Sequence, residues 1–179
     1  LDQHLAGRGW PTDGLVELLL PRAGIGELRL LIPALQHISQ KQWVMWVNPP
    51  FVPYALGLQA WGINLRHQLV VRTTTHADTP CAIERSSKSA CCGIVLAWPE
   101  EPQLSLKDTR RLQLAARSGR SLSLLFRPLN ASNKASLAEV RMALQPGEDA
   151  DTLSIDILKR KGGWPLTGLH IPLSQATGI

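Results

Sequence analysis

The sequence predicts an α/β protein with a mostly parallel central sheet and an antiparallel edge near the C-terminus. Apolar runs of strand length alternate with segments of helical periodicity up to residue 126, which is typical of parallel strands joined by helices. After residue 137, two strand-like runs follow each other without a helix, and a Gly-Gly turn leads to a third. Such runs are typical of antiparallel strands.

The composition fits one globular domain. The chain has 179 residues, of which 44% are hydrophobic and 18% are charged, enough for a single buried core. No apolar run approaches the length of about 20 residues that spans a bilayer, and no secretion signal is recognisable, so we expect a cytoplasmic protein without membrane contact. The chain begins at Leu1 instead of Met, which is compatible with a missing N-terminal piece.

Charge and cysteine content narrow the expected chemistry. The net charge of +5 permits contact with nucleic acid or an acidic partner without establishing it. The three cysteines, Cys81, Cys91 and Cys92, cannot all pair with each other, which suits reduced thiols. A metal site built from His76, Cys81 and Cys91 lacks the usual ligand spacing, so we expect no metal.

The first strand and the loop after it organise the predicted sheet. A buried strand over 15–20 leads into a loop that contains Pro21, Gly24 and Gly26, and a leucine-rich helix then ends before residue 41. Pro33 should kink this helix, because proline removes one of its hydrogen bonds.

This loop stands where a nucleotide-binding domain has its phosphate loop. Such a loop needs a Lys and a Ser or Thr, but Glu27 and Leu28 occupy these places. A carboxylate repels phosphate and a leucine cannot hold Mg²⁺. We therefore expect a degenerate loop that binds no nucleotide, and no other cofactor is indicated.

The remaining elements follow in order along the chain. Strands are predicted over 43–47, 69–71, 93–97 and 121–126, and helices over 54–61, 78–88 and 106–118. Ser105 should cap the last helix and Gly119 should end it. The antiparallel strands are predicted over 141–145, 153–160 and 169–172. One domain of residues 1–179 results, with a core over about 14–128 and a β extension over about 137–173. Residues 137–145 could pair within the chain or across a subunit boundary, so a homo-oligomer stays open.

Aromatic residues around the end of the second strand form a candidate partner surface. These residues are Trp46, Phe51, Tyr54 and Trp61. The segment 48–54 follows the carboxyl end of a strand, which is where ligands bind in doubly wound sheets. The alternative is a proline-stiffened loop that packs its own aromatic side chains.

Two groups of basic residues are candidate DNA contacts. One group lies along the helix over 106–118 and just after it, and the other lies at the Gly-Gly turn. The residues are Arg110, Arg111, Arg117 and Arg120 in the first group, and Lys159, Arg160 and Lys161 in the second. Clustered cations suit phosphates, whereas a solvated helix face and a charged guard on a sheet edge are the alternatives.

The order of the segments resembles the RecA core. The resemblance is carried by Gly14-Leu-Val-Glu-Leu, the strand over 43–47, Ala60-Trp-Gly-Ile-Asn-Leu and Leu122-Ser-Leu-Leu-Phe. It implies a RecA-like three-layer sandwich. The catalytic positions of that family fall at Glu27 and Leu28, at Asn48 or Pro49, and at Ala97 or Trp98, and all depart from its pattern. No hydrolase motif stands elsewhere, so we expect no enzyme.

Two RecA-related families without catalytic machinery are more specifically similar. Leu28-Arg-Leu-Leu-Ile-Pro-Ala-Leu and Trp43-x-x-Trp46 resemble SulA. Gly24-Ile-Gly-Glu-Leu-Arg-Leu-Leu, Pro49-Pro-Phe-Val-Pro-Tyr, Leu96-Ala-Trp-Pro and Ile157-Leu-Lys-Arg-Lys-Gly-Gly look more like ImuA, whose motifs span nearly the whole chain.

Each resemblance implies a different role in the SOS response. The ImuA resemblance implies a non-catalytic adaptor in error-prone translesion DNA synthesis, whose partners are an ImuB-like inactive Y-family polymerase and a DnaE-type polymerase. The SulA alternative implies a cell division inhibitor that binds FtsZ and blocks its polymerisation.

Overall fold

The structure, a computed structural model, describes residues 1–75, 77–101 and 104–173. Its strands are β1 (Gly14–Leu20), β2 (Trp43–Val47), β3 (Gln68–Val71), β4 (Cys92–Ala97), β5 (Leu122–Pro128), β6 (Val140–Pro146), β7 (Thr152–Lys159) and β8 (Leu166–Pro172). Its α-helices are α1 (Ile32–Ser39), α2 (Ala55–Ala60), α3 (Asp78–Lys88) and α4 (Leu106–Gly119). Short 3₁₀ helices are η1 (Asp2–His4), η2 (Glu27–Leu31), η3 (Leu65–His67) and η4 (Leu129–Asn133).

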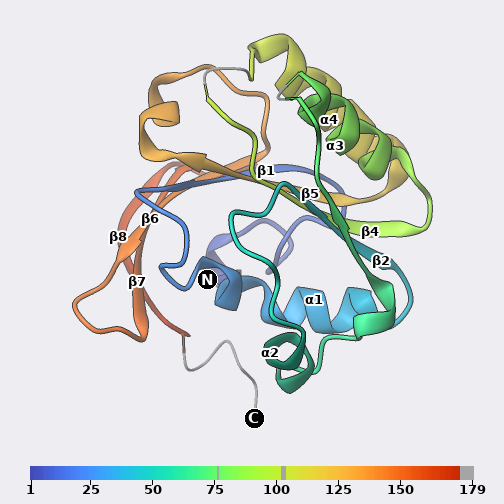
Figure 1. The fold of residues 1–179 in the computed structure, drawn as a ribbon. Coiled ribbons are helices and arrows are strands. Elements are labelled where there is room, and N and C mark those ends of the chain that lie inside the picture. Colours follow the sequence, from blue (N-terminus) through green and yellow to red (C-terminus); the bar gives the residue numbers. More distant parts are fainter. Residues whose placement is uncertain (76, 102–103, 174–179) are drawn as a thin grey trace.

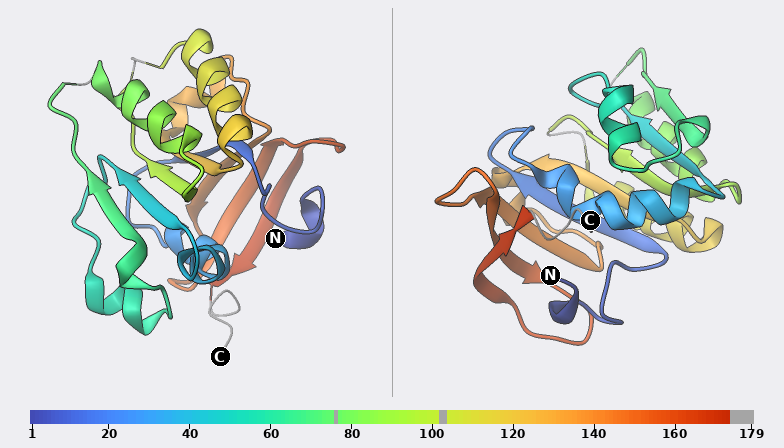
Figure 2. Two further views of the ribbon diagram at one scale, coloured as in Figure 1. Left: turned by 90° about the vertical axis from the view of Figure 1, so that its right-hand side faces the viewer. Right: turned by 90° about the horizontal axis from the view of Figure 1, so that it is seen from below.

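All eight strands form one mixed sheet in the order β3-β2-β4-β5-β1-β6-β7-β8 (Figure 1). In this order, every neighbouring pair from β3 across to β6 is parallel, whereas β7 is antiparallel to both β6 and β8. The helices α3 and α4 cover one face of the sheet near β2, β4, β5 and β1, and α1 lies on the other face against β2 and β4. The strands β7 and β8 extend beyond these helices (Figure 2).

The prediction of a RecA-like three-layer sandwich with a degenerate phosphate loop is wrong. The sheet is mixed, its helices cover only part of it, and β1 is followed by the 3₁₀ helix η2. A phosphate loop offers free backbone N–H groups to its ligand. Here the N–H groups of Gly24 and Ile25 donate to the carboxylate of Glu27, at 3.0 and 2.8 Å. The protein's own carboxylate therefore occupies the donors that a phosphate would need.

Most individual elements lie where the sequence predicts them, but Pro33 and Gly119 act differently. Pro33 stands in the first turn of α1, where its missing N–H breaks no helical hydrogen bond, so it starts the helix. Gly119 is the last residue of α4, but Arg120 takes the left-handed conformation with φ 53°. A Cβ at Gly119 would lie 1.9 Å from the carbonyl oxygen of Ser87, so this glycine allows α3 and α4 to pack closely.

The strands bury apolar side chains on both faces of the sheet. Every residue of β1 is buried, which explains why Glu17 is the only charged residue of this strand. Leu18 and Leu20 pack in the cluster that also holds Leu35 of α1. Leu15 packs in the other cluster, which holds Ile83 of α3 and Leu112 of α4.

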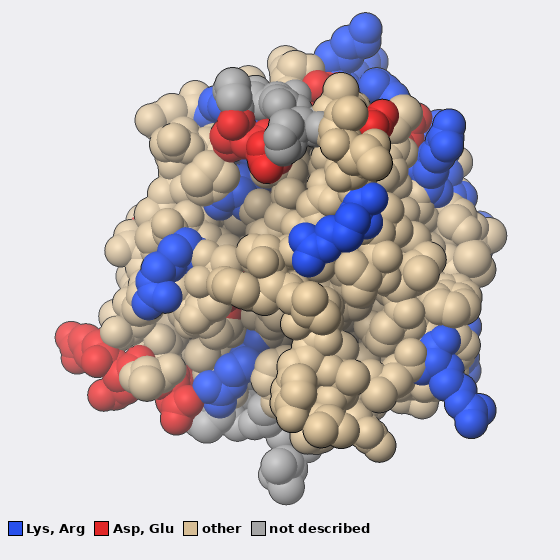
Figure 3. All heavy atoms as spheres, in the orientation of Figure 1, with Lys and Arg blue, Asp and Glu red and all other residues tan. Residues whose placement is uncertain are grey.

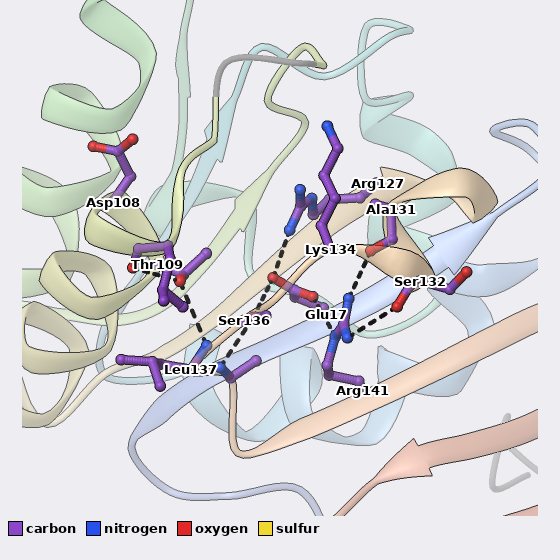
Figure 4. A network of polar contacts seen from close by, with 12 residues as sticks. Glu17, Asp108, Thr109, Arg127, Ala131, Ser132, Lys134, Ser136, Leu137 and Arg141 are labelled. Carbon is purple, nitrogen blue, oxygen red and sulfur yellow. Dashed lines mark hydrogen bonds and ion pairs between the residues drawn. The ribbon is translucent and has the colours of Figure 1, made fainter.

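A fully buried carboxylate lies between three neighbouring strands (Figure 4). Glu17 of β1 accepts a hydrogen bond from Nη1 of Arg127 in β5 at 2.8 Å, and one from Nε of Arg141 in β6 at 2.7 Å. The hydroxyl of Ser136 donates to the same carboxylate at 2.7 Å. Burying a charge is costly unless it is paired, and this carboxylate is paired on both oxygens.

Residues 137–145 pair within the chain. The strand β6 lies between β1 and β7, with Val16 opposite Val140 and Leu144 opposite Ile155. The one-domain organisation of the whole sequence stays a prediction.

Candidate functional site

An apolar groove of about 300 Å³ opens at the carboxyl ends of β1, β2 and β4. The loop after β1 forms one wall, and the segment 49–54 with α2 forms the other. We use the name apolar groove for the space lined by Ala23, Gly24, Glu27, Leu28, Trp46, Pro49, Pro50, Phe51, Val52, Pro53, Tyr54, Gly57, Leu58, Trp61 and Trp98. The carboxyl edge of a parallel sheet is a usual place for binding.

Asn48 positions the proline-rich wall. Its backbone is left-handed, with φ 50°, which asparagine tolerates better than most residues. Its Nδ2 donates to the hydroxyl oxygens of Thr73 and Thr79 at 2.8 and 3.0 Å, and its Oδ1 accepts from the backbone N–H of Thr73 at 2.9 Å. These bonds hold the first residue after β2 against the segment that follows β3.

The segment after Asn48 projects apolar side chains into solvent. Phe51, Val52 and Tyr54 are 68%, 81% and 70% exposed. Three prolines in this segment restrict φ, so the backbone that carries these side chains has few conformations to lose on binding.

Stacked aromatic rings make the floor of the apolar groove. The ring of Trp46 is buried and lies parallel to the ring of Trp98, with centroids 6.2 Å apart. Trp98 stacks in turn on Phe126 of β5 at 4.3 Å. The Nε1 of Trp46 donates to Gln68 Oε1 at 2.9 Å, which fixes the ring plane. The floor is therefore rigid and apolar.

The lining of the groove is almost uncharged. Of the described residues that line it, only Glu27 carries a charge, and its carboxylate is buried against backbone amides. The surface over α2 shows no Lys, Arg, Asp or Glu (Figure 3). Exposed apolar surface of this kind makes the groove a candidate interaction site.

The structure brings the four predicted partner residues together. Phe51, Tyr54 and Trp61 line the groove, and Trp46 lies in its floor. That they bind a partner stays a prediction. The sequence reasoning missed Val52, because an isolated valine between prolines gives no sign of its exposure. It also missed the structural role of Trp98, although this residue directly follows an apolar strand.

The basic residues of α4 do not form a continuous positive surface. Arg111 pairs with Glu84 of α3 and lies 3.7 Å from Asp108. Nε of Arg117 donates to Glu139 at 3.0 Å. The hydrogen bond to Glu84 raises the pKa of Arg111, and Lys88 together with Arg111 lowers the pKa of Glu84.

The charges of the other candidate DNA contacts are less neutralised by ion pairs. Arg110 and Arg120 are exposed and have no ion pair among the described residues. Lys159, Arg160 and Lys161 lie at the turn between β7 and β8. DNA binding by these residues stays a prediction.

The cysteines are free thiols. Cys81 and Cys91 are exposed, whereas burial raises the pKa of the Cys92 thiol to about 12 and keeps it protonated. Within 1–75, 77–101 and 104–173, no group of three or more His, Cys, Asp or Glu side chains could hold a metal ion. His76 lies outside the described residues. No helix in the described part of the chain is long and apolar enough to cross a membrane.

Sequence comparison points to one family. The family described as cell division inhibitor SulA matches residues 22–123. The cell division inhibitor SulA of Yersinia enterocolitica is 32% identical over 123 residues, which cover 67% of this chain and 72% of the relative. That of Photorhabdus laumondii is 35% identical over 117 residues, 65% of each chain, and that of Edwardsiella piscicida is 31% identical over 120 residues, 70% of the relative.

A solved structure supports the same relationship. The crystal structure of SulA from Pseudomonas aeruginosa is similar with a TM-score of 0.50 and 25% identity, over 63% of this chain and 97% of that chain. The fold is thus SulA-like, with an eight-stranded mixed sheet in place of the predicted RecA-like sandwich. The interpretation as an ImuA-like adaptor for translesion synthesis with ImuB and a DnaE-type polymerase is wrong, because the matched relatives are named cell division inhibitors.

The matched segment contains the whole apolar groove. Every described residue that lines the groove lies within 22–123, whereas β6, β7 and β8 follow that segment.

Proposed function

The chain belongs to the SulA family, and on this premise we propose that it inhibits cell division by binding FtsZ and blocking its polymerisation. The relatives' names supply the process, and the resemblance to SulA supplies FtsZ as the partner. We further propose that the apolar groove is the binding surface and that the protein acts in the cytoplasm.

The exposed wall of the groove is the observation that carries this proposal. Phe51, Val52 and Tyr54 project from a stiff segment, beside a groove with almost no charge. Aromatic anchors next to a preformed pocket are typical of protein interfaces, and stiffness lowers the entropy lost on binding. All three residues lie inside the segment shared with the family.

The proposed mechanism is occupation of a surface, without a chemical step or a cofactor. An inhibitor that only covers a subunit surface must be present at about one copy per blocked subunit. Titration of FtsZ assembly in GTP, followed by light scattering, should therefore give an end point near equimolar ratio. Complete inhibition at a small fraction of the FtsZ concentration would contradict one-to-one coverage of subunits.

Truncation of the exposed aromatics tests the surface. In Phe51→Ala and Tyr54→Ala, the Kd for FtsZ should rise, by about 30-fold for a residue that contributes about 2 kcal/mol to binding. Calorimetry or surface plasmon resonance measures this change. Leu114→Ala is the matched control, because Leu114 is 58% exposed but lies on α4, which covers the opposite face of the sheet.

The two parts of the proposal fail in different ways. If the wild-type protein does not bind FtsZ, the partner is wrong. If it binds FtsZ and the Phe51 and Tyr54 variants bind as tightly as the Leu114 variant, the partner stands and the apolar groove is not the interface.

A further inference from the structure

The turn between β7 and β8 presents two cations and an aromatic ring to solvent. A bridge between Arg160 and Gly163 closes a tight turn, with Lys161 and Gly162 at its tip. Gly162 has φ 71°, a conformation that suits glycine. Trp164 follows and is 87% exposed, the most exposed large apolar side chain among the described residues.

Arg160 supports this turn from inside. Its Nε donates to the carbonyl oxygen of Trp164 at 2.8 Å, and its Nη1 donates to the carbonyl oxygen of His4 at 2.6 Å. The guanidinium therefore joins the two sides of the turn and ties them to η1. Lys161 and Trp164 are held outward on a fixed backbone and make no side-chain hydrogen bond in the described structure.

A groove of about 410 Å³ separates this turn from α4. It is lined by Lys159, Arg160 and Lys161 on one side and by Arg117 on the other, so the fold joins two basic segments that lie far apart in sequence. Glu139, which also lines this space, neutralises Arg117. The lysines keep the groove positive.

Acidic and basic side chains lie at different ends of the strands β6, β7 and β8. The turn between β6 and β7 carries Glu148, Asp149 and Asp151, and acidic side chains gather there in Figure 3. Because β6, β7 and β8 are antiparallel, this acidic turn and the basic turn lie at opposite ends of β7. An anionic partner is therefore attracted to one end of this strand only.

We propose that the β7–β8 turn binds single-stranded nucleic acid. Trp164 stacks on a base, while Lys159 and Lys161 contact the phosphates on either side. An exposed aromatic ring on the same turn as the cations that line a positive groove resembles the sites that bind single strands without sequence preference. A lipid surface is flat and needs several apolar side chains that insert into it, whereas these lysines line a groove and only Trp164 projects among the described residues of the turn.

Fluorescence anisotropy of a labelled oligothymidylate at low salt tests the proposal. The wild-type protein should bind, and its log Kd should change steeply with log salt. Trp164→Ala should weaken binding by about 5- to 150-fold, because base–aromatic stacking has that effect on affinity. Trp164→Phe should recover most of the loss. Lys161→Ala should flatten the salt slope by about 0.7.

Matched controls separate this site from general charge. Lys41 is exposed and follows α1, which packs against β2 and β4. Lys41→Ala therefore changes the net charge equally and should leave the slope unchanged. An exposed Trp164 contributes little to folding, so thermal unfolding of the Trp164 variants should match the wild type.

Three results would overturn the proposal. The first is no binding by the wild-type protein at low salt. The second is an equal loss of oligonucleotide affinity in the Lys41 and Lys161 variants, together with unchanged affinity in the Trp164 variants. The third is binding to phosphatidylserine vesicles without binding to the oligonucleotide, which would assign the turn to a membrane surface.

Discussion

Arg141 Nε lies 2.7 Å from Glu17 Oε2, and this contact joins β6 to β1 inside the sheet (Figure 4). Arg141 also donates from Nη2 to the carbonyl oxygen of Ala131 at 2.8 Å. Glu17 is fully buried, and Arg127 holds its other oxygen. The strands that follow the SulA-like segment are thus attached to β1 by a charged pair in addition to backbone hydrogen bonds.

Neutralising Glu17 should strongly destabilise the protein. In Glu17→Gln, the buried guanidinium of Arg141 loses its carboxylate partner and that of Arg127 keeps only Glu101. The free energy of unfolding should therefore fall by about 3–5 kcal/mol. Urea denaturation measures the change. Asp151→Asn is the control, because it removes the exposed pair with Arg29 and should cost at most about 1 kcal/mol. Equal effects of the two substitutions would contradict this account.

Adding a methyl group at Gly119 should also destabilise the protein. Alanine normally favours a helix over glycine by about 1 kcal/mol. In Gly119→Ala the new Cβ would lie 1.9 Å from the backbone oxygen of Ser87, so α3 and α4 must separate. We expect a loss of about 1–3 kcal/mol in the free energy of unfolding, whereas Gly9→Ala, with nothing within 4 Å, should be nearly neutral. A gain in stability at Gly119 would show that the helices adjust freely.

Acid should weaken the ion pairs of Glu101. Burial is the largest single influence and raises the pKa of Glu101, but Lys134 and Arg127 together lower this pKa below its ordinary value of 4.5. A carboxyl group whose pKa is lower in the folded state than in the unfolded state stabilises the folded protein at pH values above the unfolded pKa. This stabilisation is lost as the pH falls through the folded pKa. The free energy of unfolding of the wild type should therefore exceed that of Glu101→Gln by the largest amount at neutral pH. This difference should shrink below about pH 4.5. Urea denaturation at several pH values measures it, and a constant difference would contradict the assignment.

The loop after β1 should bind no nucleotide. Calorimetry with Mg-ATP should show no binding, because Glu27 occupies the N–H groups of Gly24 and Ile25. Micromolar affinity would show that another cation, Arg22 or Arg29, replaces the absent lysine. Glu27→Ala should lower the free energy of unfolding by about 1–3 kcal/mol, since these buried donors lose their acceptor.

Several elements could be predicted from local sequence. The apolar run of β2 and the helix α3 lie at 43–47 and 78–88, as predicted, because periodicity and length suffice for such segments. The Ser105 cap is confirmed, with Asp108 N–H donating to its hydroxyl at 3.2 Å. The kink at Pro33 was predicted wrongly, because helix initiation depends on where the preceding loop ends.

The sequence by itself determined where most strands and helices lie and which segments are apolar or basic, since these properties reside in residues a few positions apart. Only the tertiary structure decided what these segments do together. It buried Trp46 and left Phe51 exposed, paired Arg117 with Glu139, and turned Glu27 onto its own loop. Exposure and charge pairing depend on residues distant in the chain, so local patterns of residue type could not reveal them.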